Sequence, residues 1–175
     1  MKTQLTNPEV SIAIVEDNSI YAKVIEKELF NRKFINFKTY ATGEEFFEKQ
    51  KEPVDVLILD YHLDSVNPNA MDGLEVIKKL KTVAPETYVI MLSADDNINV
   101  AVVALRHGAH EYIVKSETAS TRLEMALNAI RNALNQTRDL KDSKKVNVVM
   151  LVVYVLVILA VYALSLLYPS LFKMG

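Results

Sequence analysis

Cysteine is absent from the 175-residue sequence, which excludes disulfides, thiol nucleophiles and thiolate metal sites. Basic blocks are absent too, and the formal net charge is −2, so we expect no nucleic-acid partner. The N-terminal residues, MKTQLTNPEV, lack the apolar core of a secretory signal peptide. The length fits one globular domain with an appended segment.

Charged residues are almost absent after Lys145. Residues 146–168, VNVVMLVVYVLVILAVYALSLLY, include no charged residue, and only Asn147 and Ser165 are clearly polar. Every acidic residue, and every basic residue except Lys173, precedes this stretch. The chain therefore consists of a charged part of soluble type and a strongly apolar tail.

Five apolar runs of strand length alternate with segments of helical periodicity. Residues 54–59 (VDVLIL) continue directly into Asp60, which is typical of a strand buried on both faces of a parallel sheet. The alternation predicts an α/β fold, a doubly wound five-stranded parallel sheet with helices on both faces. The expected strands are residues 10–15, 34–40, 54–60, 87–92 and 111–114. The expected helices run from Asn18 or Ser19 to Phe30, from Thr42 through Phe47, over 73–83 and 97–107, and from Thr121 to about Arg138.

A polar residue of chemical interest follows four of these strands. Glu16 and Asp17 follow the first strand, Asp60 the third, Ser93 the fourth and Lys115 the fifth. A parallel sheet brings its carboxyl ends to one edge, where ligands bind in open α/β folds. Three carboxylates at one edge repel one another unless a cation neutralises them, and Mg²⁺ suits such a donor set.

This set of residues fits one chemistry, phosphoryl transfer. A carboxylate such as Asp60 can act as a nucleophile toward phosphorus and form an aspartyl phosphate. The transfer needs in-line positioning and neutralisation of charge, which Mg²⁺ and the ammonium group of Lys115 would supply. The hydroxyl of Ser93 could donate a hydrogen bond to a phosphoryl oxygen.

The sequence resembles the receiver domain of response regulators in two-component signalling (CheY-like) over about residues 9–138. The matching motifs are the acidic pair Glu16-Asp17, LILDYHL around Asp60, and the segments MDG at 71–73, LSA at 92–94 and YIVK at 112–115. The resemblance implies the flavodoxin-like receiver fold. It also implies phosphorylation by a histidine kinase or a phosphotransfer protein, and a regulator that performs no enzymatic reaction beyond its own phosphorylation and dephosphorylation.

The resemblance also implies roles for individual residues. Asp60 would be the phosphoacceptor, and it would bind Mg²⁺ together with Glu16 and Asp17. Lys115 would contact the phosphoryl group. Ser93 would be the switching hydroxyl and Tyr112 the aromatic ring that moves with it. His62 and Asp95 occupy the two positions that tune the lifetime of the phosphoryl group.

Two segments depart from the family pattern. The family often has a proline with a cis peptide bond after the conserved lysine, whereas Ser116 follows Lys115 here. A cis bond before a residue other than proline costs about 3 kcal/mol, so we expect no cis bond. The loop at Asp64–Ala70 (DSVNPNA) is several residues longer than usual.

Two other functions compete with the phosphoacceptor. Phosphatases of the haloacid-dehalogenase type also use an aspartate nucleophile, but they need a second Asp two residues later, and His62 stands there. A degenerate receiver would act as a membrane adaptor without phosphorylation. Singly, each residue also has an ordinary structural interpretation, as a helix cap, a turn hydroxyl, a solvated lysine or a packed ring.

The apolar tail predicts a transmembrane helix over residues 146–168. At a rise of about 1.5 Å per residue, its length is enough to cross a hydrocarbon core of roughly 30 Å. Residues 139–145 (DLKDSKK) would be a charged linker and residues 169–175 a short extracytoplasmic tail. Basic residues flank the tail mainly on its N-terminal side, which predicts a single-pass protein of the cell membrane with a cytoplasmic receiver. We therefore expect a membrane-proximal protein partner in place of an output domain, and a homodimer is possible.

Overall fold

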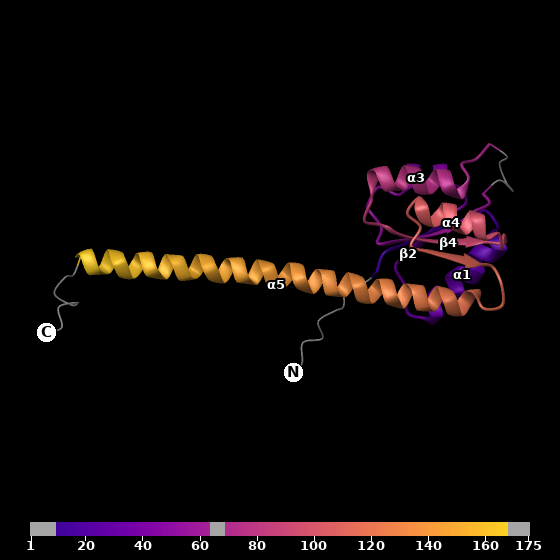
Figure 1. Cartoon of the computed structure of the whole chain (residues 1–175). Helices are drawn as coiled ribbons and strands as arrows, with labels where there is room; N and C mark the ends of the chain where they lie inside the picture. The colour runs from indigo at the N-terminus through magenta and orange to yellow at the C-terminus, as the bar shows by residue number, and fades with distance from the viewer. Residues whose placement is uncertain (1–9, 64–68, 168–175) are drawn as a thin grey trace. The chain divides into compact units, whose positions relative to one another are not determined.

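The computed structural model describes residues 10–63 and 69–167, of which Asp139, 141–145 and 163–167 are described by their backbone alone. The chain divides into two compact units, residues 1–131 and residues 132–175. The first unit contains the sheet, and the second contains the larger part of the last helix (Figure 1). The site that we predict from the sequence therefore belongs to the first unit.

A five-stranded parallel sheet forms the centre of the first unit, as the sequence predicts. The strand order is β2-β1-β3-β4-β5, so the chain moves outward from β1 in both directions. Such an order has its topological switch point beside β1, where the neighbouring crossovers diverge. The strands are β1 (Ile12–Val15), β2 (Phe37–Tyr40), β3 (Val56–Asp60), β4 (Tyr88–Ser93) and β5 (Glu111–Val114).

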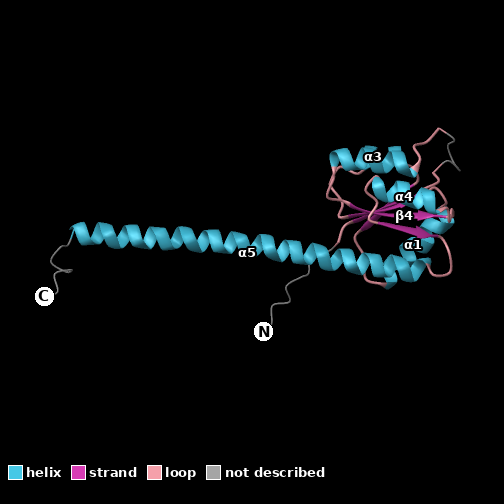
Figure 2. Cartoon of the chain, in the orientation of Figure 1, coloured by secondary structure: helices cyan, strands magenta, loops and turns pink. Residues whose placement is uncertain are grey.

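Helices cover both faces of this sheet (Figure 2). In Figures 1 and 2, α3 and α4 lie on one face, and α1 and the first part of α5 lie on the other. Val76, Ile77 and Leu80 of α3 are buried in one apolar cluster with Leu57 and Leu59 of β3. The helices are α1 (Ser19–Asn31), α2 (Gly43–Lys49), α3 (Gly73–Val83), α4 (Ile98–Arg106) and α5 (Ala119–Leu167).

Side-chain caps fix where the helices begin. Asn18 caps α1, and Thr42 caps α2 by accepting a hydrogen bond from the N–H of Glu45. Thr42 and Glu45 have the spacing of a capping box, but the box is incomplete, because the Glu45 carboxylate accepts from the N–H of Ala41 instead of that of Thr42. A complete box occurs at α3, where Asp72 and Glu75 each accept from the other's backbone N–H. The sequence prediction missed it because Gly73 separated Asp72 from the apolar run.

Some expected boundaries were wrong. The second strand starts at Phe37 rather than Phe34, and α5 starts at Ala119 and continues helically through residues 139–145 to Leu167. No cis peptide bond occurs in the described part of the chain, which includes the bond between Lys115 and Ser116. Most of the expected long loop, residues 64–68, lies outside the described residues.

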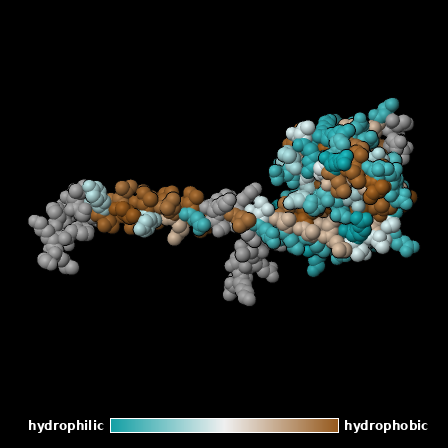
Figure 3. All heavy atoms as spheres, viewed as in Figure 1, coloured by the Kyte–Doolittle hydropathy of each residue, from teal (hydrophilic) through white to brown (hydrophobic). Residues whose placement is uncertain are grey.

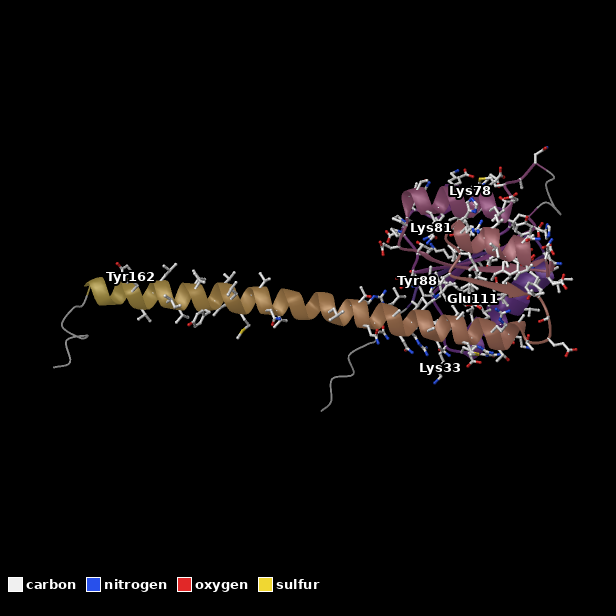
Figure 4. The ribbon with its side chains drawn as sticks, in the orientation of Figure 1. Lys33, Lys78, Lys81, Tyr88, Glu111 and Tyr162 are labelled. Carbon is white, nitrogen blue, oxygen red and sulfur yellow. The ribbon has the colours of Figure 1, made fainter. Side chains whose placement is uncertain are left out.

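A lysine side chain binds the segment that leads into β4, at the amino-terminal edge of the sheet. Lys81, labelled on α3 in Figure 4, donates hydrogen bonds to the carbonyl oxygens of Pro85 (3.1 Å) and Thr87 (2.7 Å). Burial lowers the pKa of Lys81. Its side chain also packs against Gly108, whose φ of +103° allows the turn after α4.

The apolar tail forms the C-terminal part of α5, where the last described side chain is that of Tyr162. The described side chains of residues 146–162 are largely apolar and exposed, as the brown spheres of the second unit show (Figure 3). Among the residues with a described structure, we find no helix whose length and apolarity would let it cross a membrane. The predicted span at 146–168 extends beyond the described side chains, and the structure does not support it.

Candidate functional site

The predicted site residues meet at the carboxyl edge of the sheet. The register pairs Val15 with Leu59, so Glu16 and Asp60 are adjacent residues at the ends of neighbouring strands. Ser93 ends β4 and pairs with Val114 of β5, the residue before Lys115. The backbone N–H of Lys115 donates to the carbonyl oxygen of Ser93 at 2.7 Å. Parallel pairing therefore brings four separate chain segments to one place.

Lys115 joins two buried carboxylates. Its Nζ lies 2.8 Å from Asp60 Oδ2, and 2.9 and 3.2 Å from the two carboxylate oxygens of Glu16. Glu16 is 2% exposed and Asp60 is 5% exposed. Charge-assisted hydrogen bonds of this length in a buried setting are strong and sensitive to the loss of one partner.

The pKa values reflect this crowding. Burial, followed by the negative charge of Asp60, raises the pKa of Glu16 from 4.5 to about 7, although Lys115 opposes the shift. Burial by itself would lower the pKa of Lys115, but its hydrogen bonds to Asp60 and Glu16 outweigh that effect and raise the pKa. Lys115 is therefore positively charged at neutral pH, and the raised pKa of Glu16 lies close to neutrality.

Glu16, Asp17 and Asp60 could hold a metal ion. One ligand oxygen from each of the three residues lies within 4.8 Å of the others. Carboxylate oxygens are hard ligands, and Mg²⁺ in proteins is held by one or two carboxylates together with waters and phosphate oxygens. The donor set therefore fits Mg²⁺, as expected from the sequence.

The predicted switching residues are both hydrogen-bonded to the backbone of one residue, Asp95. Ser93 is fully buried, and its Oγ accepts a hydrogen bond from the N–H of Asp95 at 3.0 Å. The hydroxyl of Tyr112, a buried residue, donates to the carbonyl oxygen of Asp95 at 2.8 Å. Burial raises the pKa of Tyr112, which keeps its hydroxyl protonated as a donor. Sequence reasoning paired Ser93 with Tyr112, but it could not find the Asp95 backbone between them.

His62 and Asp95, the two lifetime-tuning candidates, lie near Asp60 and Ser93. The N–H of His62 donates to Asp60 Oδ1 at 3.3 Å, while its exposed ring contacts that of Tyr61 edge-on, with centroids 4.6 Å apart. The Asp95 carboxylate accepts from the N–H of Asn97 at 2.8 Å. Both residues are therefore placed by backbone hydrogen bonds beside the site.

Gly73 lets the N-terminus of α3 approach Asp60 closely. A Cβ atom at this position would lie 2.6 Å from the Asp60 carbonyl oxygen and 2.8 Å from Tyr61 Cα. The N–H of Gly73 also donates to the Tyr61 carbonyl oxygen at 2.9 Å. Any side chain would push α3 away from β3, which gives a physical reason for glycine in the MDG motif.

Sequence reasoning missed two residues near this site. Tyr21 of α1 places its ring 4.4 Å from Lys115 Nζ, and its place in the apolar pattern of α1 concealed that contact. Glu44 of α2 accepts a hydrogen bond from the N–H of Met71 at 2.8 Å, which ties the segment before α3 to α2. No sequence motif signals either contact, because each joins elements that are distant along the chain.

Comparison with known proteins gives a consistent assignment. Regulatory protein LuxO of Vibrio cholerae is 30% identical over 115 residues, which cover 65% of this chain and 24% of LuxO. A receiver domain protein of Clostridium thermocellum has a similar structure, with a TM-score of 0.62 at 23% identity, covering 73% of this chain and 98% of that one. The DrrB receiver domain of Thermotoga maritima gives 0.60 at 26% identity, covering 69% and 96%. The chain spans about a quarter of the length of the curated relatives that it matches.

The family model for the response regulator receiver domain matches residues 12–128. That range runs from β1 into the first part of α5, and it includes Glu16, Asp60, Ser93 and Lys115. Because the match covers most of the chain and the whole strand-end site, this chain belongs to the response regulator receiver domain family.

Proposed function

We propose that Asp60 accepts a phosphoryl group and that this modification switches a protein-interaction surface of the receiver. The observation that carries the proposal is the 2.8 Å contact between Lys115 Nζ and Asp60 Oδ2 beside a second buried carboxylate. A merely structural ion pair needs one carboxylate for one ammonium. The additional acids, Glu16 and Asp17, raise the negative charge at this edge to a level that suits a cation-dependent reaction.

In the proposed reaction, an oxygen of Asp60 attacks the phosphorus atom of the donor. A new O–P bond forms while the bond from phosphorus to the leaving group breaks, and the leaving group takes the electron pair. The carboxylate loses no proton in this step. Lys115 stabilises the charge of the phosphoryl oxygens and keeps its proton, because its pKa is raised.

Glu16, Asp17 and Asp60 would hold Mg²⁺, which supplies charge neutralisation and orientation for the phosphoryl oxygens. Glu16 would have to release its hydrogen bonds to Lys115, at least in part, to take that role. Lys115 would then be freer to contact the incoming phosphoryl group.

The donors that we propose are a histidine kinase or a phosphotransfer protein. The similar DrrB receiver domain has been solved in a BeF3-activated form, which is consistent with a phosphoacceptor in a relative. We propose that the chain is a regulator rather than an enzyme with a separate substrate. A degenerate receiver would instead bind its partner equally well after Asp60→Ala.

The first prediction concerns the acceptor. Incubation of the full-length protein with Mg²⁺ and acetyl phosphate should add about 80 Da, the mass of one phosphoryl group. Intact-mass spectrometry measures the adduct. Asp60→Asn is the matched control, because it keeps the size of the side chain and removes the nucleophilic charge. No adduct on the wild type, or an adduct that persists in Asp60→Asn, contradicts the assignment.

The second prediction concerns pH. Mg²⁺ binding requires the deprotonated carboxylate, and the pKa of Glu16 is raised to about 7. The apparent affinity for Mg²⁺ should therefore rise about tenfold between pH 6 and pH 8, since protons compete below the pKa. Isothermal titration calorimetry measures it. Glu16→Gln removes the titrating group, so this variant should bind Mg²⁺ weakly and its affinity should change less with pH. A wild-type affinity that does not change between pH 6 and pH 8 would contradict the prediction.

We also propose that Ser93 and Tyr112 transmit phosphorylation to the protein surface. Movement of the Ser93 hydroxyl toward a phosphoryl oxygen would release the N–H of Asp95, and Tyr112 holds the carbonyl oxygen of the same residue. The two side chains would therefore respond together. His62 and Asp95, which flank the site, are our candidates for setting the phosphoryl lifetime.

The third prediction tests this coupling. Phosphorylation should shift the backbone amide NMR signal of Asp95 in the wild type, because its hydrogen-bond acceptor changes. Ser93→Ala should still gain the adduct, but the shift at Asp95 should be much smaller. An equally large shift in Ser93→Ala would show that the signal reaches Asp95 without Ser93.

We further propose that the apolar tail anchors the receiver at a membrane, with the receiver on the cytoplasmic side and a membrane-proximal protein as its partner. The support is the uncharged sequence of residues 146–168, together with the exposed apolar side chains over 146–162. A helix that is apolar on all sides is buried either in protein or in a bilayer.

The fourth prediction tests the anchor. After alkaline carbonate extraction, the full-length protein should stay with the membrane pellet, because an inserted apolar helix resists release by high pH. A matched chain that ends at Lys145 should be released. Release of the full-length protein would rule out the anchor.

A further inference from the structure

Tyr21 contacts Lys115, the lysine beside Asp60, and the proposed phosphoryl transfer gives Tyr21 no role. Lys115 Nζ lies 4.4 Å from the centroid of its ring, within the range of a cation–π interaction. The same nitrogen lies 2.8 Å from Asp60 and 2.9 Å from Glu16. The ammonium group therefore has three contacts, two with carboxylates and one with an aromatic face.

The helix cap holds Tyr21 in this place. Asn18 Oδ1 accepts hydrogen bonds from the N–H groups of Ile20 (3.0 Å) and Tyr21 (3.1 Å). Asn18 directly follows the acidic pair at the end of β1. The first turn of α1, and with it the start of the Tyr21 side chain, is thus attached to the strand that carries Glu16.

The charged groups of the site influence the pKa of the Tyr21 hydroxyl. Burial raises the pKa of Tyr21, Lys115 acts against the shift, and Glu16 and Asp60 add to it. The hydroxyl therefore stays protonated and the ring stays neutral. Tyr21 and Ser116, the residue after Lys115, also line one cavity, so the tyrosine lies beside the segment that follows Lys115.

We propose that Tyr21 is a positioning residue for phosphoryl transfer, whose ring holds the ammonium group of Lys115 over Asp60. This inference rests on the proposed phosphoacceptor function. A lysine side chain has several rotatable bonds, and ordering them costs rotamer entropy. When Glu16 binds a cation, it releases its hydrogen bonds to Lys115, at least in part. The Tyr21 ring binds no cation from solution in this reaction and can keep its contact with Lys115. Being neutral, the ring also attracts the ammonium group without neutralising its charge.

The experiment compares Tyr21→Leu with Tyr21→Phe in the full-length protein. With acetyl phosphate and saturating Mg²⁺, Tyr21→Leu should gain the adduct about three- to tenfold more slowly, as expected for the loss of a partly desolvated cation–π contact. Tyr21→Phe keeps the ring and should stay within about twofold of the wild type, since its face also attracts cations. Mg²⁺ affinity should not change, because Tyr21 supplies no metal ligand. Ile20→Ala, a change at a 77% exposed neighbour, is the matched control for α1.

NMR of the lysine side chains gives a readout that does not depend on phosphorylation. The ring current of Tyr21 should shift the side-chain signals of Lys115 in the wild type and in Tyr21→Phe, and Tyr21→Leu should remove that shift. Equal adduct rates in Tyr21→Leu and the wild type overturn the proposal, as does a Tyr21→Phe rate as low as that of Tyr21→Leu. If the wild type gains no adduct, the phosphoacceptor function fails, and the NMR shift still decides whether Tyr21 holds Lys115.

Discussion

The ammonium group of Lys115 is the interaction on which the site depends. Two buried carboxylates, Glu16 and Asp60, face each other at the ends of adjacent strands, and their mutual repulsion contributes to the raised pKa of Glu16. Lys115 bridges them at 2.8 and 2.9 Å. Loss of one partner from a buried ion pair typically costs about 3–5 kcal/mol. In the proposed reaction, the same charge would contact a phosphoryl group once a cation binds Glu16.

The parallel register makes this arrangement possible at low strain. Residues that end neighbouring strands become neighbours without any special loop, and Lys115 is held further by its N–H bond to the Ser93 carbonyl oxygen. Gly73 brings α3 against the back of Asp60, and Asn18 brings α1 against Lys115 through Tyr21. The Asp60 carboxylate thus contacts Lys115 on one oxygen and the N–H of His62 on the other.

The site has two distinct connections to the rest of the first unit. One passes from Ser93 through the backbone of Asp95 to Tyr112, and hydrogen bonds form both of its contacts. The other passes from Lys115 to Tyr21 on α1 and relies on the attraction between an ammonium group and a ring face. Under the proposed function, phosphorylation of Asp60 would act on both, because Ser93 and Lys115 are the two groups proposed to contact the phosphoryl oxygens.

The sequence by itself determined the order of strands and helices along the chain and which residues end the strands. Apolar runs such as VLIL before Asp60 carry that information locally, because strands and helices can be recognised from the pattern of apolar residues within a short window of sequence. The amphipathic pattern also gave α3 its observed bounds, Gly73–Val83. Only the tertiary structure decided the contacts between distant segments. Three such features arise from packing and burial, which no local pattern of residues records: the hydrogen bonds of the Asp95 backbone with Ser93 and Tyr112, the ring of Tyr21 on Lys115 and the raised pKa of Glu16.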